Sequence, residues 1–100
     1  RKSRGDRMVI GVVTANISIP ESQSLKDKRQ VLRSLKDRAV NKMNVSVAEV
    51  RSQDKWQIAE MAIVTVAGDS AIVQSRISDI SSFVRSTPRY IVIDLHTEIR

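Results

Sequence analysis

The chain has 100 residues, of which 41% are hydrophobic and 28% charged, values typical of one globular domain rather than of a disordered or fibrous protein. It contains no cysteine, so a disulfide framework, a thiol nucleophile and a cysteine-ligated metal site are excluded. No apolar stretch approaches the roughly 20 residues that cross a bilayer, and no secretory signal pattern is found, so we expect a cytoplasmic protein.

The formal net charge of +6 is concentrated in two segments. Residues 1–7 carry four bases and one acid without any apolar residue, and are predicted to form a flexible basic tail. Residues 24–43 carry seven bases and two acids. Such clustering suits a polyanion-binding surface, and it is also compatible with an ordinary solvated helix face.

The first two predicted elements are a strand and a helix. Residues 8–19 alternate apolar and polar side chains with the period of a half-buried strand, which Pro20 ends. Ser24, with Asp27 three residues later, is a capping box that opens a helix. Apolar side chains then recur at three- and four-residue spacing and give the helix one apolar face. They are Val31, Leu32, Leu35, Ala39 and Met43.

The second half of the chain contains two strands, a helix and a last strand. The strands cover residues 44–53 and 56–67, with a turn at Asp54 and Lys55. Gly68 and Asp69 break the second strand, and the periodicity predicts a helix over residues 70–86. Residues 90–99 alternate as the last strand. The side chains expected to face inward from it are Ile91, Ile93, Leu95 and Ile99.

The order β-α-β-β-α-β predicts an α+β fold of the ferredoxin-like, split βαβ type. Two right-handed crossovers around a central hairpin give a four-stranded antiparallel sheet with both helices on one face. Residues 1–7 would then precede a single ferredoxin-like domain over residues 8–100.

No set of residues known to carry catalysis is found. His96 is the only histidine, so multi-histidine metal sites are unavailable in one chain. We expect it on the helix-free face, as an exposed or interface residue rather than a catalytic base. The three glycines are too dispersed to form a phosphate-binding loop. Acylphosphatases share the topology but grip phosphate in the loop after the first strand, and residues 18–24 hold no arginine or glycine. We therefore expect a non-enzymatic protein with no cofactor and no metal; a small enzyme that borrows residues from another subunit is the less favoured alternative.

RNA-recognition motifs also share this topology, and they stack bases on aromatic side chains of the central strands. The aromatic residues here are Trp56, Phe83 and Tyr90, and Phe83 belongs to the predicted core. Stacking on the sheet is therefore disfavoured, and any nucleic-acid contact should use the first helix and the tail through phosphates.

The bases of the first helix form a stripe beside its apolar face, at about 100° per residue. Lys28 falls within the apolar arc itself, and we expect its ammonium to emerge at the helix start beside Lys26, in a local positive cluster. The predicted RNA-binding residues are Lys26, Lys28, Arg29, Arg33 and Lys36.

Three short segments are more specific than composition explains. They read Ser-Leu-Lys-Asp-Lys-Arg at residues 24–29, Asn-Val-Ser-Val-Ala-Glu-Val at residues 44–50 and Asp-Lys-Trp-Gln-Ile-Ala at residues 54–59. In these segments the chain resembles the YlxP-like family of small bacterial proteins, a domain of unknown function, and the likeness spans roughly Met8 to Ile99. The family has the ferredoxin-like fold, is encoded among transcription and translation factors, and is described as similar to ribosome-binding factors. The resemblance therefore implies an RNA or ribosomal partner.

Four residues of these segments form a candidate motif surface: Glu49, Asp54, Trp56 and Gln57. One interpretation is a recognition patch, with a large aromatic anchor ringed by hydrogen-bonding groups. In the other, Asp54 caps the turn, Trp56 covers the end of the core and Glu49 pairs with a base of the helix. We favour the structural interpretation for Asp54 and Trp56.

Two functions remain open at this point. The leading hypothesis is a non-enzymatic RNA- or ribosome-binding protein, a factor in ribosome assembly or translation, that grips phosphates with the basic stripe of its first helix. The alternative is a protein–protein interaction module, or a homodimer, that uses the open face of the sheet. The side chains expected on that face are Ile10, Val12, Tyr90 and Val92.

Overall fold

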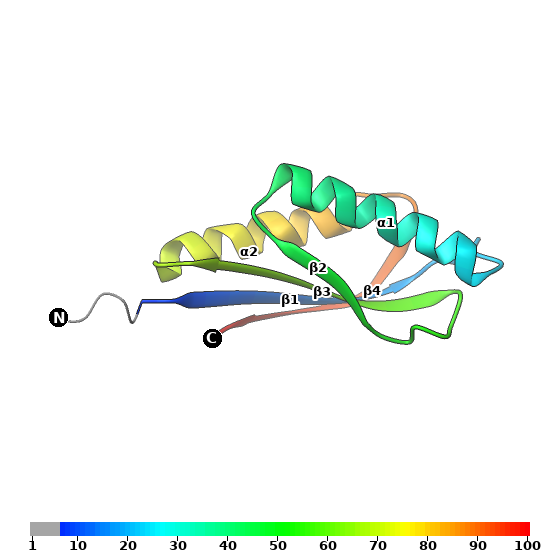
Figure 1. Ribbon diagram of the computed structural model, residues 1–100, viewed down its shortest axis with the longest axis horizontal. Helices are drawn as coiled ribbons and strands as arrows, with labels where there is room; N and C mark the ends of the chain where they lie inside the picture. Colours follow the sequence, from blue (N-terminus) through cyan, green and yellow to red (C-terminus); the bar gives the residue numbers. More distant parts are fainter. Residues whose placement is uncertain (1–6) are drawn as a thin grey trace.

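The computed structural model describes residues 7–100, and its elements follow the predicted order (Figure 1). Of the predicted basic tail, residues 1–6 lie outside the described part, and Arg7 is exposed. The elements are β1 (Val9–Ser18), α1 (Leu25–Lys42), β2 (Ser46–Arg51), β3 (Ile58–Ala67), α2 (Ser70–Arg85) and β4 (Ile91–Ile99). No helix within residues 7–100 is long and apolar enough to cross a membrane.

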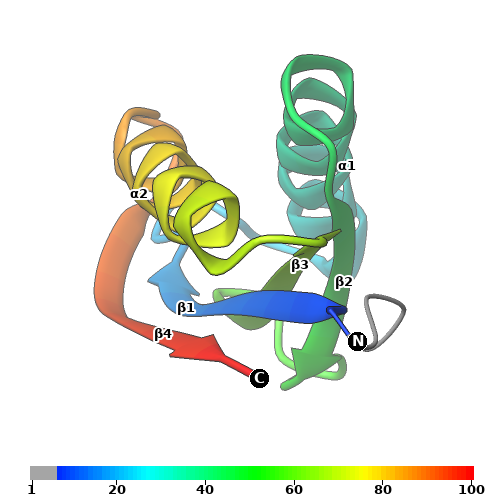
Figure 2. The same ribbon diagram turned by 90° about the vertical axis from the view of Figure 1, so that its left-hand side faces the viewer.

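The four strands form one sheet in the order β2-β3-β1-β4, and every neighbouring pair is antiparallel. Both helices lie on the same side of this sheet, as Figure 2 shows. The predicted α+β, ferredoxin-like architecture is therefore confirmed. It leaves two edges, β2 and β4, and one sheet face without a covering layer.

Side chains at the first turn fix where each helix begins. Ser24 Oγ accepts a hydrogen bond of 3.0 Å from the Asp27 N–H, as the capping box predicts. The Asp27 carboxylate returns to the Gln23 N–H at 2.9 Å, one residue before the cap. Asp69 accepts a 2.7 Å bond from the Ala71 N–H and caps α2 in the same way.

The core fills the layer between the sheet and the helices, where the odd positions of β1 are buried. At Gly11 the helix α2 comes unusually close to the sheet, because a Cβ added there would lie 2.7 Å from Val73 Cγ1. Arg76 also meets the sheet from α2, and its guanidinium donates to Thr65 Oγ1 at 3.1 Å and to the Val66 carbonyl at 2.9 Å. These two oxygens partner a guanidinium that lies beside the apolar face of α2.

The predicted inward face of the last strand is partly wrong, because β4 contains a bulge. Asn16 of β1 pairs with Asp94 and the next residue, Ile17, pairs with Val92, so Ile93 is an extra residue. The bulge reverses the alternation on its N-terminal side. Ile91 and Ile93 are each 59% exposed, whereas Val92 and Leu95 pack against the core. Ile99 also lies in the exposed class, at 42%.

The same shift of register removes two residues from the predicted open face. Tyr90 is buried and Val92 is partly buried against the core, so neither lies on the uncovered side of the sheet. Ile10 and Val12 do lie there, opposite Val66 and Val64 of β3. The open face is therefore apolar where the N-terminal half of β1 meets the C-terminal half of β3, and it is more polar toward Asn16 and Glu60.

We predict that Tyr90 makes the stability of the fold sensitive to alkaline pH. Its hydroxyl donates a 2.7 Å bond to the Val84 carbonyl. Burial raises the pKa of the Tyr90 phenol to about 12, against a smaller opposing effect of Arg38. An unfolded tyrosine ionises near pH 10, so the stabilisation by the neutral phenol is fully present below pH 10 and is lost as the pH rises through about 12.

The test compares the native chain with Tyr90→Phe in urea unfolding at a series of pH values. At neutral pH the variant should lose about 1 kcal/mol of unfolding free energy with the phenol–carbonyl bond. The difference in unfolding free energy between the two proteins should shrink above about pH 10. In the unmutated protein the unfolded state is then favoured because its phenol ionises, whereas the variant has no phenol at position 90. A difference that stays constant to about pH 11.5 would contradict the burial of an un-ionised hydroxyl.

Candidate nucleic-acid interface

Lys28 of α1 is the most buried charged side chain in the described structure, at 1% exposure. Its ammonium donates hydrogen bonds to Glu49 Oε2 at 2.7 Å, to the Ser52 carbonyl at 2.8 Å and to the Ile58 carbonyl at 3.2 Å. An ammonium has three N–H donors, and all three are used. Lys28 thus joins α1 to the end of β2 and to the start of β3.

The prediction that the Lys28 ammonium emerges at the protein surface is therefore wrong. Its position lies within the apolar arc of α1, so the side chain enters the layer between helix and hairpin instead of turning toward Lys26. A buried charge there requires a counter-ion, and Glu49, itself 19% exposed at the side chain, supplies it. Because no N–H remains free, Lys28 is not available to bind a phosphate.

The loop between β2 and β3, residues 52–57, is held at both ends by this ammonium through Ser52 and Ile58. Ser52 has a φ of 65°, the left-handed conformation that few residues other than glycine adopt. The Lys55 N–H closes the turn by donating to the Ser52 carbonyl at 3.0 Å. Backbone atoms thus close the turn, and Asp54 lies exposed within it instead of capping it.

Gln57 ties the same loop to the segment that leads into α1. Its side-chain amide donates to the carbonyls of Pro20 at 3.2 Å and Ser22 at 3.0 Å. Its own carbonyl accepts a 2.8 Å bond from the Ile19 N–H. The residues of the three distinctive segments therefore meet at one junction, where Lys28, Glu49 and Gln57 have structural roles.

Trp56 does not share this role. The prediction that it covers the end of the core is wrong, because the residue is 52% exposed. Of the four residues of the candidate motif surface, Glu49 and Gln57 are used within the fold, as described above. Asp54 and Trp56 are left facing solvent.

The other four predicted RNA-binding residues are all exposed on one side of α1: Lys26, Arg29, Arg33 and Lys36. We call them the basic stripe. Within residues 7–100, the ion pairs shorter than 4 Å are Lys28–Glu49, Arg51–Glu60 and Arg100–Glu98, so no carboxylate there neutralises the stripe.

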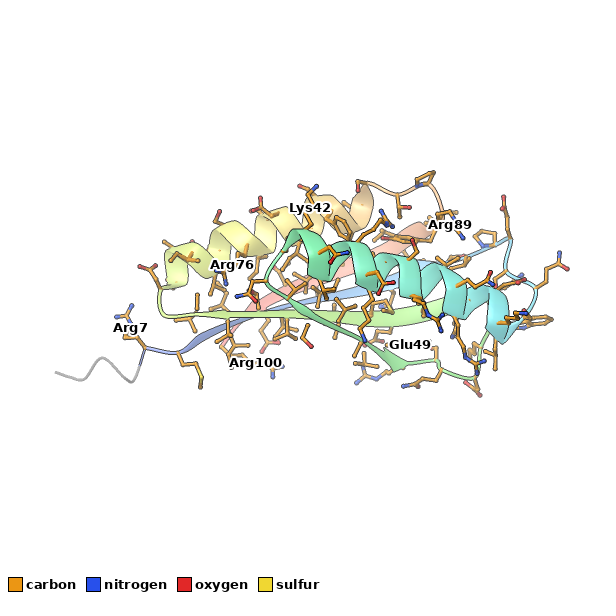
Figure 3. The ribbon with its side chains drawn as sticks, turned by 45° about the horizontal axis from the view of Figure 1, so that its top comes forward. Arg7, Lys42, Glu49, Arg76, Arg89 and Arg100 are labelled. Atoms are coloured by element: carbon orange, nitrogen blue, oxygen red, sulfur yellow. The ribbon has the colours of Figure 1, made fainter. Side chains whose placement is uncertain are left out.

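A groove runs between the basic stripe and the edge strand β2. Its lining combines the last three residues of the stripe with apolar side chains and Glu49. Figure 3 shows Glu49 on β2 below α1, with Lys42 and Arg89 on the opposite side of that helix. The lining residues are Arg29, Leu32, Arg33, Lys36, Val47, Ala48, Glu49 and Met61.

A second basic region, which was not among the predicted RNA-binding residues, lies between the two helices. The Arg38 guanidinium lies 5.4 Å and the Lys42 ammonium 5.9 Å from the centre of the Phe83 ring. The spacing of four residues between the two bases was the available signal, because it places them on one face of a helix. Contact with an aromatic face gives these cations a structural role within the fold.

Neither the histidine nor the acids form a chemical centre in the described structure. Within residues 7–100 no group of three or more histidine, aspartate and glutamate side chains is placed to hold a metal ion. His96 pairs with Thr14 and is exposed on the open face, where it was expected.

We predict that Glu49→Ala lowers the unfolding free energy by about 3 to 5 kcal/mol, because it leaves a buried ammonium without its counter-ion. Urea unfolding monitored by circular dichroism measures the loss. The matched control is Glu98→Ala, which removes a carboxylate whose partner Arg100 lies in solvent and should barely move the urea midpoint. Equal midpoints for the two variants would mean that the Lys28 ammonium is hydrated in the folded protein.

A double variant tests whether the destabilisation of Glu49→Ala comes from the unpaired charge of Lys28 or from lost side-chain packing. Replacing both partners, Lys28→Met with Glu49→Leu, removes the buried charge together with its counter-ion. This double variant should be more stable than Glu49→Ala alone, because apolar side chains of similar volume often replace a buried ion pair without loss.

Two comparisons with known proteins agree on the relationships of this chain. Residues 10–97 match the model of a family described as "Protein of unknown function (DUF503)". The chain is also 32% identical over 80 residues to "Uncharacterized protein YlxP" of Bacillus subtilis (strain 168), an alignment that covers 80% of this chain and 87% of the relative. The family resemblance inferred from the three short segments is thereby confirmed, and the chain belongs to the DUF503 family.

Proposed function

We propose that this protein binds RNA without catalysing a reaction, and that the basic stripe of α1 grips the phosphates. The observation that carries the proposal is the stripe itself: four exposed cations on one side of a helix, without a carboxylate partner in the described structure. Cations that are not neutralised within the protein are available to replace the counter-ions of a polyanion.

The length of the stripe suits a nucleic-acid backbone. Ten residues separate its first and last members, Lys26 and Lys36, which corresponds to about 15 Å along the helix axis. A polynucleotide presents several phosphates over such a length. The groove beside β2 continues this surface, so that a strand lying along α1 would also contact the sheet edge.

The acid among the groove's lining residues does not oppose a polyanion. This acid, Glu49, is neutralised by Lys28. The Lys28–Glu49 pair therefore supports the proposal in two ways: it holds α1 against the hairpin, and it offsets the negative charge in a groove that also carries Arg29, Arg33 and Lys36.

The resemblance of the three segments to the YlxP-like family, which is described as similar to ribosome-binding factors, directs the proposal to ribosomal RNA. On this basis the protein acts in the cytoplasm, in ribosome assembly or in translation, and its partner is a ribosomal subunit. No cofactor enters the proposal, because phosphate binding by fixed cations requires none.

A second candidate function is self-association through the open sheet face. Ile10, Val12, Val64 and Val66 lie next to one another there through the pairing of β1 with β3. A twofold axis parallel to the strands would place the β2 edge of one copy over the β4 edge of the other. Arg51 on the first edge and the acids of β4 on the second have complementary charges.

We predict that reversing the basic stripe abolishes RNA binding. In the variant Lys26→Glu, Arg29→Glu, Arg33→Glu and Lys36→Glu, four attractive phosphate contacts become repulsive, so affinity should fall by at least about 100-fold. The measurement is co-sedimentation with the small subunit, the large subunit and the intact ribosome at increasing salt. With about four phosphates bound, the logarithm of the association constant should fall with the logarithm of salt at a slope of about −3 for native protein.

The matched control reverses four exposed bases that lie on the other side of α1, at the end of α2 and in the segment before β4: Arg38, Lys42, Arg85 and Arg89. It changes the net charge by the same amount and should retain most of the binding. Circular dichroism confirms that both variants are folded. If the control lost binding and the stripe variant retained it, the RNA would bind at the second basic region, between the helices, and the proposal would be contradicted.

The second candidate predicts a mass that depends on concentration. Light scattering of the native chain should then show a monomer converting to a dimer, and Val12→Lys with Val64→Lys should abolish the dimer by placing charges at the centre of the apolar face. A monomer mass for the native chain at every concentration would exclude self-association.

A further inference from the structure

One of the three aromatic side chains is exposed to solvent, whereas the other two are buried in the core. Phe83 and Tyr90 are 9% and 6% exposed, whereas Trp56 is 52% exposed. Burying a tryptophan is one of the largest hydrophobic gains available to a small domain, and about half of this gain is forgone here. Resting on the proposed function, we infer that Trp56 stacks on an unpaired base of the bound RNA, so that the ligand is single-stranded.

The exposure of Trp56 is not a result of a loose loop. Both ends of the loop, at Ser52 and Ile58, are bonded to the buried ammonium of Lys28, and the next residue after the indole, Gln57, makes three further hydrogen bonds. Another bond joins the Gln53 side chain to the Glu49 carbonyl at 3.3 Å. The tryptophan is therefore presented by a fixed backbone, which lowers the entropic cost of binding a flat ligand.

The anchored loop also lies next to the basic stripe. Lys28 is on the first turn of α1, between Lys26 and Arg29, and its ammonium reaches the loop directly. Figure 1 shows the connection between β2 and β3 beside the first turns of α1. A strand whose phosphates are held at the start of the stripe thus has its bases near Trp56. Within the loop the exposed Lys55 is offset by the exposed Asp54, so the attraction for phosphates comes from the stripe.

Stacking on this side chain selects unpaired nucleotides. In an A-form duplex the bases stack on one another and offer only their edges and the backbone, whereas bases in loops, bulges and ends can be splayed onto an aromatic ring. Every base has a flat face, so such stacking accepts any sequence. The proposed pairing of one indole with a row of cations is the combination that general single-strand binders use.

The test uses the fact that Trp56 is the only tryptophan, so fluorescence excited at the long-wavelength edge of the protein absorption, where tyrosine does not absorb, reports on this residue alone. The probes are a fluorescein-labelled single-stranded oligoribonucleotide of mixed sequence and the same strand annealed to its complement. Anisotropy of the label measures binding, and tryptophan emission measures stacking. We expect the single strand to bind more tightly than the duplex and to quench the emission.

Two variants complete the test. Trp56→Ala should weaken single-strand binding by about 5- to 100-fold, the range known for loss of one stacked base, and Trp56→Phe should restore part of it. The control Ile93→Ala truncates an exposed apolar side chain on the opposite sheet edge and should change nothing. Urea midpoints verify that each variant is folded, as expected because the loop is held by bonds that do not involve the indole.

This inference rests on the proposed function, and the outcomes distinguish the two. RNA binding that depends on the basic stripe but leaves the emission unquenched and is unaffected by Trp56→Ala overturns the stacking inference while the proposed function stands. Equal affinity for the single strand and the duplex likewise overturns the stacking inference and leaves the proposed function standing. Absence of binding to either probe at low salt overturns the proposed function and the inference with it.

Discussion

The ammonium of Lys28 is the point on which the arrangement of the first half of the chain depends. It has three acceptors from β2, the following loop and β3, all at least 21 residues away along the sequence. A state in which α1 has packed on the sheet before the hairpin has closed would hold a buried cation without these acceptors, which is strongly unfavourable. Such partly folded states are therefore suppressed, and α1 and the hairpin fold as one cooperative unit. The residues that distinguish the family segments serve this unit: Glu49 supplies the counter-charge, and Gln57 binds the chain just before the helix.

The fold separates two surfaces of opposite character. The side formed by α1 and the edge of β2 carries exposed cations that are not paired in the described structure, and Glu49 there is neutralised by Lys28. The open side of the sheet carries an apolar patch on β1 and β3, and its β4 edge carries Asp94, which accepts a 2.8 Å bond from Asn16, and Glu98, which is paired with Arg100. A polyanion is attracted to the basic stripe, whereas the apolar patch offers it no cation. RNA binding and self-association, if both occur, would therefore use opposite sides of the molecule.

Much of the fold was predictable because the sequence signals are local. Alternation, helical periodicity and the caps at Ser24 and Asp69 are each encoded within a few residues, and the structure confirms them. The errors arose where the outcome depends on a distant partner. The burial of the Lys28 ammonium depends on its ion pair with Glu49, and the residues near position 28 do not show that this carboxylate lies within hydrogen-bonding distance. The inward face of β4 depends on a bulge opposite β1, and a single extra residue reverses the side chains on one side of it. For the candidate interface, helical geometry sufficed to find the basic stripe, whereas the exposure of Trp56 depends on how its loop is tied down in three dimensions.

The bulge in β4 also bears on how the molecule avoids sticking to itself at the sheet edge. β4 is a nine-residue edge strand, and it exposes Ile91 and Ile93 to solvent. A long, flat edge of this kind would be a template for adding strands from other molecules and eventually for aggregation. The extra residue at position 93 interrupts the regular ladder of hydrogen-bonding groups, and the carboxylates of Asp94 and Glu98 flank the C-terminal part of the strand with like charges. The irregularity that breaks the alternation pattern thus also makes this edge a poorer template for the addition of a strand from another molecule.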